Sequence, residues 1–244
     1  MTIEKVETLI AEINRIHLDY SKDYFETGKI EKVNLSHTFS KVPVQAILDY
    51  RLNLHESIND YLMTADLKGI DYVYRVKTSE SILDKIKRFK ERETAYPVNN
   101  VLNDIFGARI ILESDQIAEV LNSLDDWKEK YGLKNWYLRD KEGYIGIHVY
   151  FKNKSNFYYP WELQIWDSKD VTSNIENHRL YKRNFVKWGM AIMSDLIGIL
   201  ISFVETVRGV IYFFEKLLGL KKIKVGNLFQ LFLLRKKIIF GIRL

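Results

Sequence analysis

Cysteine is absent from the sequence, so disulfide bonds and thiolate metal sites are both excluded. Proline is scarce, with 3 residues in 244, and helices are therefore expected to be plentiful. The first residues include acidic side chains where a secretory signal needs a basic start and an unbroken apolar run. These absences argue against secretion and favour a cytoplasmic protein.

Strong charge of one sign is also lacking, since the formal net charge is only +5. Hydrophobic residues make up 47% of the chain, which is typical of a globular protein. The basic residues gather in two stretches, 75–92 and 221–243. The first stretch suits phosphates, and the second suits a membrane surface or nucleic acid, although short basic clusters are more often solvated faces.

The last part of the chain is apolar but contains no long run of uncharged residues. The apolar stretch Met190–Leu220 is interrupted by charged residues, among them Asp195, Glu205, Arg208 and Glu215. Between them, Leu196–Val204 falls far short of the roughly 20 residues that a spanning helix needs. We expect residues 186–244 to form a helical apolar and basic segment that packs on the catalytic domain or on a partner. Peripheral membrane contact stays open.

Two amphipathic helices are predicted at the N-terminus. Apolar residues recur at helical spacing over 3–20, and a second set does so over 44–63. Residues 1–66 are therefore expected to form a helical cap that packs on the domain that follows.

Residues 67–185 alternate between strand and helix patterns. β-Branched and aromatic runs predict five strands: 72–76, 108–112, 136–138, 147–151 and 161–166. Helices are predicted over 79–90, after a cap at Thr78 or Ser79, and over 116–131. Strands interleaved with helices indicate an α+β fold with a mixed sheet.

A basic cluster surrounds the first strand and the helix after it. Arg75 and Lys77 are two residues apart on the strand, so they point to the same side. Helical spacing places three more residues on one face: Ser81, Lys85 and Arg88. Arginine and lysine near a helix start suit a polyphosphate, although this spacing alone is also that of an ordinary basic helix face.

Two acidic residues adjoin apolar strands. Asp104 comes just before one strand, and Glu162 lies within Trp-Glu-Leu-Gln-Ile-Trp, where an acid is out of place. If both strands belong to one sheet, these carboxylates can hold Mg²⁺ against ATP phosphates, because Mg²⁺ favours one or two carboxylates, substrate oxygens and water. A glycine-flanked tyrosine, Tyr144, with His148 four residues on, can offer its ring to a base.

Five motifs occur in order: RVKTSESILDKIKR (75–88), DIFGARI (104–110), GYIGIH (143–148), WELQIW (161–166) and NHRLYK (177–182). Together they resemble the synthetase domain of the RelA/SpoT alarmone family, of the small alarmone synthetase type. The resemblance spans roughly residues 40–185. It implies a nucleotidyltransferase-like mixed sheet flanked by helices, and pyrophosphate transfer from ATP to the ribose 3′-oxygen of GDP or GTP.

The resemblance also implies roles for residues on the donor side. Arg75 and Arg109 would sandwich the adenine, an arrangement that guanidinium stacking on a ring favours. The ATP phosphates would be held by Lys77, Ser81, Lys85 and Arg88. Asp104 would bind Mg²⁺, and Glu162 would bind the metal or draw the proton from the attacking hydroxyl.

On the acceptor side, Tyr144 would stack on the acceptor base. The other acceptor-binding residues would be His148, Gln164 and Lys141. Here the chain departs from the family pattern: Ile145 and Gly146 replace an arginine and a serine. Trp166 replaces a further arginine, and Val171 replaces a polar residue. The lysine-bearing loop before Gly143 is shortened to residues 139–142.

These departures leave three functions open. The first is synthesis of (p)ppGpp from GDP or GTP. The second is a toxin-type relative that pyrophosphorylates the 3′ end of tRNA, which a basic chain suits. The third is a catalytically inactive nucleotide-binding or membrane-associated regulator, against which the presence of both Asp104 and Glu162 argues. No adjacent His-Asp pair occurs, so a hydrolase domain of the long relatives is not expected. A homo-oligomer is also left open.

Overall fold

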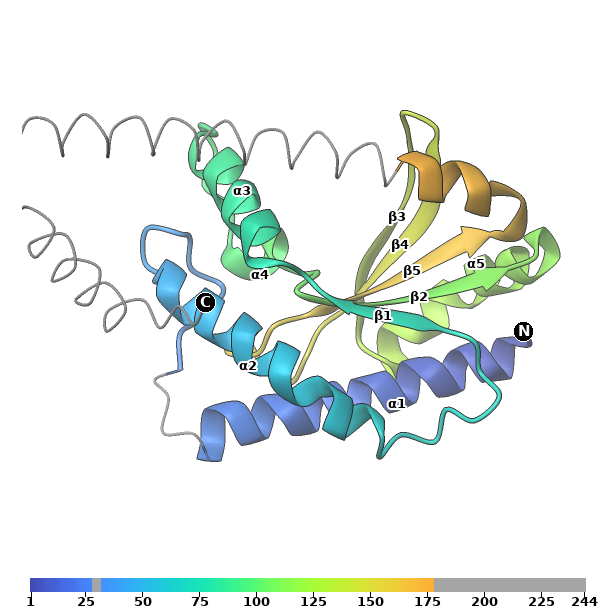
Figure 1. Ribbon diagram of the computed structural model, residues 1–244, viewed down its shortest axis with the longest axis horizontal. Helices are drawn as coiled ribbons and strands as arrows, with labels where there is room; N and C mark the ends of the chain where they lie inside the picture. Colours follow the sequence, from blue (N-terminus) through green and yellow to red (C-terminus); the bar gives the residue numbers. More distant parts are fainter. Residues whose placement is uncertain (28–31, 178–244) are drawn as a thin grey trace, which may run out of the picture. The chain divides into compact units, whose positions relative to one another are not determined.

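The computed structural model describes residues 1–27 and 32–177 (Figure 1). The expected C-terminal segment 186–244 lies outside these residues, as does most of the closing motif 177–182. The domain limits at 66 and 185 stay predictions. Among the described helices, none has both the length and the apolarity needed to cross a bilayer.

The described residues form a five-stranded mixed sheet, which confirms the expected α+β fold. The strands are β1 (Val73–Val76), β2 (Phe106–Leu112), β3 (Leu133–Lys141), β4 (Tyr144–Phe151) and β5 (Trp161–Asp167). Their order across the sheet is β1-β2-β5-β4-β3. β2 and β5 are parallel, and the other neighbouring pairs are antiparallel. β5 therefore lies between two strands that precede it in sequence.

The helices follow the predicted pattern, with three short additions. They are α1 (Ile3–Lys22), α2 (Val44–Leu62), α3 (Ser79–Lys90), α4 (Val98–Val101) and α5 (Ser114–Lys130). A π-helix extends α1 over Asp23–Thr27, and a 3₁₀ turn covers Ser168–Asp170. The sequence analysis did not predict α4, the π-helix or the 3₁₀ turn, because elements of three to five residues are too short to show a period.

One face of the sheet is covered by helices. Alternate residues of β2, such as Phe106, Ala108 and Ile110, are buried in the same core as the apolar face of α1. α1 and α5 lie on one side of the sheet (Figure 1). The Trp161 indole on β5 donates to Asn14 of α1 at 2.8 Å. Since side chains alternate along a strand, the other residues of β2 and β5 point to the opposite face.

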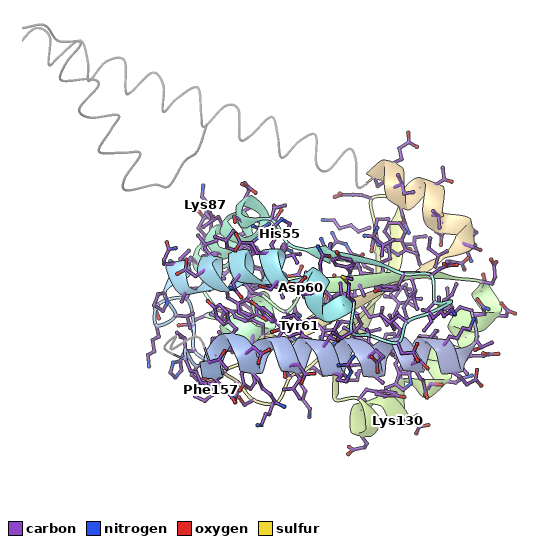
Figure 2. All side chains as sticks on the ribbon, turned by 60° about the horizontal axis from the view of Figure 1, so that its bottom comes forward. His55, Asp60, Tyr61, Lys87, Lys130 and Phe157 are labelled. Carbon is purple, nitrogen blue, oxygen red and sulfur yellow. The ribbon has the colours of Figure 1, made fainter. Side chains whose placement is uncertain are left out.

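Contacts between helices complete this layer. Lys130 of α5, labelled in Figure 2, forms a 2.7 Å ion pair with Glu7 of α1. Tyr61 of α2, also labelled there, donates to Asp23 just beyond α1. Its ring meets that of Tyr20 edge to face, at 5.6 Å between centroids. α1 is therefore fixed to α2 on one side and α5 on the other.

The β3–β4 hairpin is longer and tighter than expected. Lys141 pairs with Tyr144, so that only Glu142 and Gly143 form the turn. Both have positive φ, 56° and 78°, as a type I′ turn requires. The predicted loop over 139–142 is therefore wrong: residues 139–141 are strand. Pairing with β4 extends β3 through charged residues whose own strand propensity is low.

Candidate active site

The register of the sheet builds the site in rows on the face opposite α1. The first row runs across four strands through Arg75, Gly107, Glu162 and Tyr150. The next row contains Arg109, Gln164, His148 and Tyr137. Gly107 has no side chain, so Arg75 reaches across it from β1 to β5. Residues distant in sequence thus meet because their strands are neighbours.

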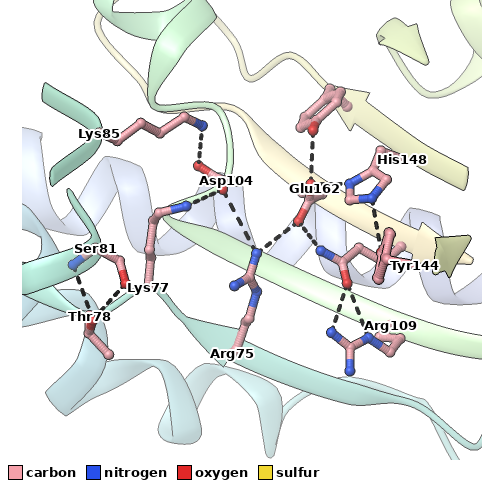
Figure 3. A network of polar contacts seen from close by, with 12 residues as sticks. Arg75, Lys77, Thr78, Ser81, Lys85, Asp104, Arg109, Tyr144, His148 and Glu162 are labelled. Carbon is pink, nitrogen blue, oxygen red and sulfur yellow. Dashed lines mark hydrogen bonds and ion pairs between the residues drawn. The ribbon is translucent and has the colours of Figure 1, made fainter. Parts of the chain in front are cut away.

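Glu162 is at the centre of the site, with 2% of its surface exposed. Among the described residues, four side chains donate to its carboxylate (Figure 3). The His148 Nδ1 and the Tyr150 hydroxyl lie 2.7 and 2.9 Å from Oε1. The Arg75 guanidinium and the Gln164 amide lie 3.1 and 2.7 Å from Oε2. Burial raises the pKa of Glu162, but these partners hold that pKa well below its usual value.

Asp104 is the second buried carboxylate, and ammonium groups surround it. Lys77 donates to Oδ2, and Lys85 Nζ lies 3.2 Å from Oδ1. Arg75 is 3.8 Å from Oδ2. Burial raises the pKa of Asp104, and the charges of Lys85 and Lys77 lower it further than burial raises it, so the group stays ionised. Figure 3 shows Arg75 lying between Asp104 and Glu162.

The junction between β1 and α3 places the two lysines. The Lys77 N–H donates to the Ile105 carbonyl at 2.8 Å, which extends the β1–β2 ladder to the residue beside Asp104. Thr78 then caps α3, accepting from the Ser81 N–H at 3.3 Å. α3 begins at once, and its second turn brings Lys85 back over the same carboxylate. Of the two residues predicted as the cap, Thr78 and Ser79, the structure has Thr78.

Asp104 and Glu162 are the carboxylates that would hold a magnesium ion if one arrives with a nucleotide, and this role stays a prediction. One nitrogen of Arg75 lies 3.1 Å from Glu162 and 3.8 Å from Asp104, so both acids face the same place. In the described ranges, no group of three or more His, Cys, Asp or Glu residues could hold a metal unaided. Mg²⁺ commonly uses one or two carboxylates and completes its octahedron with phosphate oxygens and water.

Arg109 and Gln164 form the next row of the site. The Arg109 Nε and Nη2 donate to the Gln164 Oε1 at 3.1 and 2.8 Å. The guanidinium carbon lies 3.6 Å from the centroid of the Trp166 ring. Arg109 and Arg75 thus stand on one face of neighbouring strands. Their role as a sandwich for adenine stays a prediction.

Tyr144 and His148, expected on the acceptor side, contact each other. The Tyr144 hydroxyl is 3.0 Å from the His148 Nε2. The Trp166 indole N–H donates to the same hydroxyl at 3.0 Å. The Arg139 guanidinium, from β3, lies 5.6 Å from the centre of the Tyr144 ring. The structure therefore brings these two residues to the same network as Glu162.

Three predicted site residues have other partners. Arg88 forms a 2.8 Å pair with Asp84 on the surface of α3. Lys141, with two thirds of its side chain exposed, is 3.4 Å from Glu142. Ser81 is bound by Thr78. Their roles in binding ATP or the acceptor stay predictions.

Sequence reasoning missed Tyr150 and Tyr137. Tyr150 donates directly to Glu162, and Tyr137 stacks on His148 with ring centroids 5.2 Å apart. For Tyr150 a signal existed: Tyr144, His148 and Tyr150 are separated by even numbers of residues, which places them on one strand face. Tyr137 carried no such signal, because its position depends on the register of β3 against β4.

The part of the chain that holds this network matches a known protein family. Residues 74–185 match the model described as the region found in RelA / SpoT proteins. This match confirms the resemblance that the five motifs indicated.

Solved structures of small alarmone synthetases are also similar. Small alarmone synthetase 1 of Bacillus subtilis is 19% identical over 69% of this chain and 93% of its own, with a TM-score of 0.36. For the enzyme bound to its product pppGpp, the identity is 21%, the coverages 70% and 95%, and the TM-score 0.32. Small alarmone synthetase 2 of the same organism is 26% identical, with coverages of 58% and 78% and a TM-score of 0.33. No curated protein matches the chain.

Proposed function

We propose that the protein transfers pyrophosphate from ATP to the ribose 3′-hydroxyl of GDP or GTP, and so makes (p)ppGpp. The observation that carries this proposal is the pair of buried carboxylates, Asp104 and Glu162, flanked by Arg75, Lys77 and Lys85 within the residues that match the RelA/SpoT region. Partly exposed cations beside buried, ionised acids suit a ligand that brings both phosphates and a divalent ion.

On the donor side, this chain contributes cations that already point at one place. Lys77 and Lys85 contact Asp104, and the phosphates of ATP offer them further anionic partners. Asp104 and Glu162 would hold Mg²⁺, which when bound would neutralise charge on the phosphate oxygens. Arg75 and Arg109 would bind the adenine between them. We propose Ser81 and Arg88 as further phosphate ligands.

Pyrophosphate transfer fixes which bonds change. The acceptor 3′-oxygen bonds to the β-phosphorus, the bond from that phosphorus to the α,β-bridging oxygen breaks, and AMP leaves with that oxygen. The hydroxyl proton passes to a base. Glu162 already accepts four hydrogen bonds within the described part of the chain, so it must lose one to take this proton. Coordination of the metal would likewise need a lone pair of this carboxylate, so we propose Glu162 either as a metal ligand or as the base that takes the proton.

On the acceptor side, Tyr144 is proposed to stack on the base, with His148 and Gln164 beside the nucleotide and Lys141 near its phosphates. A second acceptor, the 3′ end of tRNA, stays in consideration because Gly146 and Trp166 alter this part of the site. A homo-oligomer is also proposed.

The proposal is tested by incubating the protein with Mg²⁺, ATP labelled with ³²P at the γ position, and GDP, GTP or deacylated tRNA in separate reactions. We expect label in guanosine tetra- or pentaphosphate. We expect no label with Asp104→Asn, while Asp60→Asn, an exposed acid on α2 (Figure 2), serves as the matched control.

Each other result has a definite meaning. Label on tRNA alone would replace the guanosine acceptor by RNA. If ATP binds but no acceptor is labelled, the protein is a nucleotide-binding regulator and the proposal is wrong. Equal activity in Asp104→Asn and the wild type would contradict the role of the carboxylates.

A further inference from the structure

A closed ring of contacts joins the residues proposed for the ATP side to those proposed for the acceptor side. It runs through Glu162, His148, Tyr144, Trp166, Arg109 and Gln164, and returns to Glu162. Figure 3 shows Arg109, Tyr144 and His148 grouped on one side of Glu162. Trp166 is the member that links Arg109 to Tyr144.

Trp166 makes two contacts of different kinds. Its ring lies 3.6 Å from the guanidinium carbon of Arg109, and its indole N–H lies 3.0 Å from the Tyr144 hydroxyl. It is 2% exposed, so it does both from a fixed position. A guanidinium has two faces, and Trp166 covers one of them. Gln164 holds the edge of the same group.

The indole N–H and the Glu162 carboxylate are the two ends of a chain of hydrogen bonds. An indole N–H can only donate, so the Tyr144 oxygen accepts from it. The carboxylate of Glu162 can only accept, so a neutral His148 carries its proton on Nδ1 and accepts at Nε2. With that tautomer, the Tyr144 O–H donates to His148. The Trp166 N–H supplies the first hydrogen bond of this chain.

Gly146 provides the space for this arrangement. A Cβ added at position 146 would lie 2.9 Å from the Tyr144 hydroxyl, and 3.1 and 3.2 Å from Cδ1 and Nε1 of Trp166. Such distances require the tyrosine or the indole to move. The position of the Trp166 indole beside Tyr144 therefore depends on the absence of a side chain at residue 146.

We propose that Trp166 is a positioning residue that couples the two substrate sides of the site. Its ring orients Arg109 for the base of ATP, and its N–H orients Tyr144 for the base of the acceptor. Gly146 leaves room for the second of these contacts, between Trp166 and Tyr144. This inference rests on the proposed function, because it takes Arg109 and Tyr144 as the residues that meet the two bases.

Three variants distinguish the contact of Trp166 with Arg109 from its contact with Tyr144. Trp166→Phe keeps a ring against Arg109 and removes the N–H. Gly146→Ala disturbs the contact of Trp166 with Tyr144 from the opposite side. Trp166→Leu removes both contacts. Trp136→Phe, a partly exposed tryptophan on β3, is the matched control.

Two readouts are measured for each variant. One is the Kd of α,β-methylene-ATP by calorimetry. This measurement needs no transfer, because a methylene group replaces the α,β-bridging oxygen whose bond to the β-phosphorus breaks in the reaction. The other is the acceptor KM, with kcat, in the labelled-ATP assay. For Trp166→Phe and Gly146→Ala we expect an acceptor KM about fivefold higher with the analogue Kd within about twofold, as for one lost hydrogen bond. For Trp166→Leu we expect both constants to rise about fivefold.

The outcomes distinguish this inference from the proposed function. Equal rises of both constants in Trp166→Phe would reduce Trp166 to a packing role, and unchanged constants in Trp166→Leu would remove it from the site; either overturns the inference. If the wild type transfers nothing, the proposed function fails. A weaker analogue Kd in Trp166→Leu but not in Trp166→Phe would then still support the contact with Arg109.

Discussion

At the scale of single residues, the site depends on how the two buried acids are paired. Asp104 faces ammonium groups that a phosphate could attract away. Glu162 instead accepts hydrogen bonds from side chains that belong to the sheet itself. The lysine partners of Asp104 can thus be shared with a bound phosphate. The carboxylate of Glu162 is held in one orientation by its neighbours in the sheet.

The hydrogen bond from Tyr150 to Glu162 has a measurable effect on stability. Hydrogen bonds to charged groups contribute about 2 kcal/mol, so we expect Tyr150→Phe to lower the free energy of unfolding in urea by about that amount at pH 7. Tyr137→Phe is the control, because the Tyr137 hydroxyl lies 3.3 Å from that of Tyr150 and makes no bond to Glu162. Equal losses in the two variants would contradict the special role of the carboxylate.

The sign of the pH dependence follows from the lowered pKa of Glu162. A carboxyl whose pKa is lower in the folded state stabilises the protein above its usual pKa of 4.5. This contribution is lost as the pH falls below that value. The difference between wild type and Tyr150→Phe should therefore be full at pH 7 and shrink on acidification below about 4.5.

At the scale of elements, the turn from β1 into α3 positions the lysines around Asp104. Thr78 is the N-cap residue of α3, and its hydroxyl oxygen accepts a hydrogen bond from the Ser81 N–H. Lys77 precedes this cap directly, and Lys85 follows it by two turns of helix. The local signal for this junction, an N-cap threonine before an amphipathic pattern, was readable in the sequence.

Removing the cap tests this junction. We expect Thr78→Ala to lower the free energy of unfolding by about 1 kcal/mol, and to raise the Kd of α,β-methylene-ATP, because α3 loses an N-terminal acceptor. Thr78→Ser keeps the hydroxyl and should leave both quantities near those of the wild type. If serine and alanine have the same effect, the hydroxyl does not cap the helix.

The packing of α1 on the sheet includes a buried histidine. His17 stacks on Phe106 at 5.7 Å, and Asn153 lies 3.1 Å from its Nδ1. Its Nε2 has no hydrogen-bond partner among the residues that the structure describes. Burial lowers the pKa of His17 from 6.5 to about 4. The neutral ring is thus part of the core.

Because of this histidine, the stability of the protein decreases as the pH is lowered. In the unfolded chain His17 is protonated with a pKa of 6.5, whereas in the folded chain its pKa is about 4. The contribution of the neutral ring to stability is therefore fully present above pH 6.5 and declines below it. We expect the wild type to lose about 3 kcal/mol more than His17→Phe between pH 7 and pH 4. Parallel stability curves for the two proteins would show that His17 is not buried as described.

At the scale of the whole molecule, the sequence predicted which elements exist better than how they meet. The long amphipathic helices were readable because their apolar period repeats several times. The strand order was not readable, since β5 enters between β2 and β4 through pairing over long sequence distances. Tyr150 and Tyr137 were missed for that reason, whereas Asp104 and Glu162 were found because an acid beside or within an apolar strand is itself unusual.

The bond changes of the proposed reaction can be followed directly with labelled ATP. ATP labelled with ³²P at the α, β or γ position is incubated in three parallel reactions with Mg²⁺ and the acceptor that the first assay identifies. Attack on the β-phosphorus predicts that the β and γ labels both appear in the product, while the α label remains in AMP. Transfer of the γ label alone, or of the α label, would contradict pyrophosphate transfer and with it the function proposed for this site.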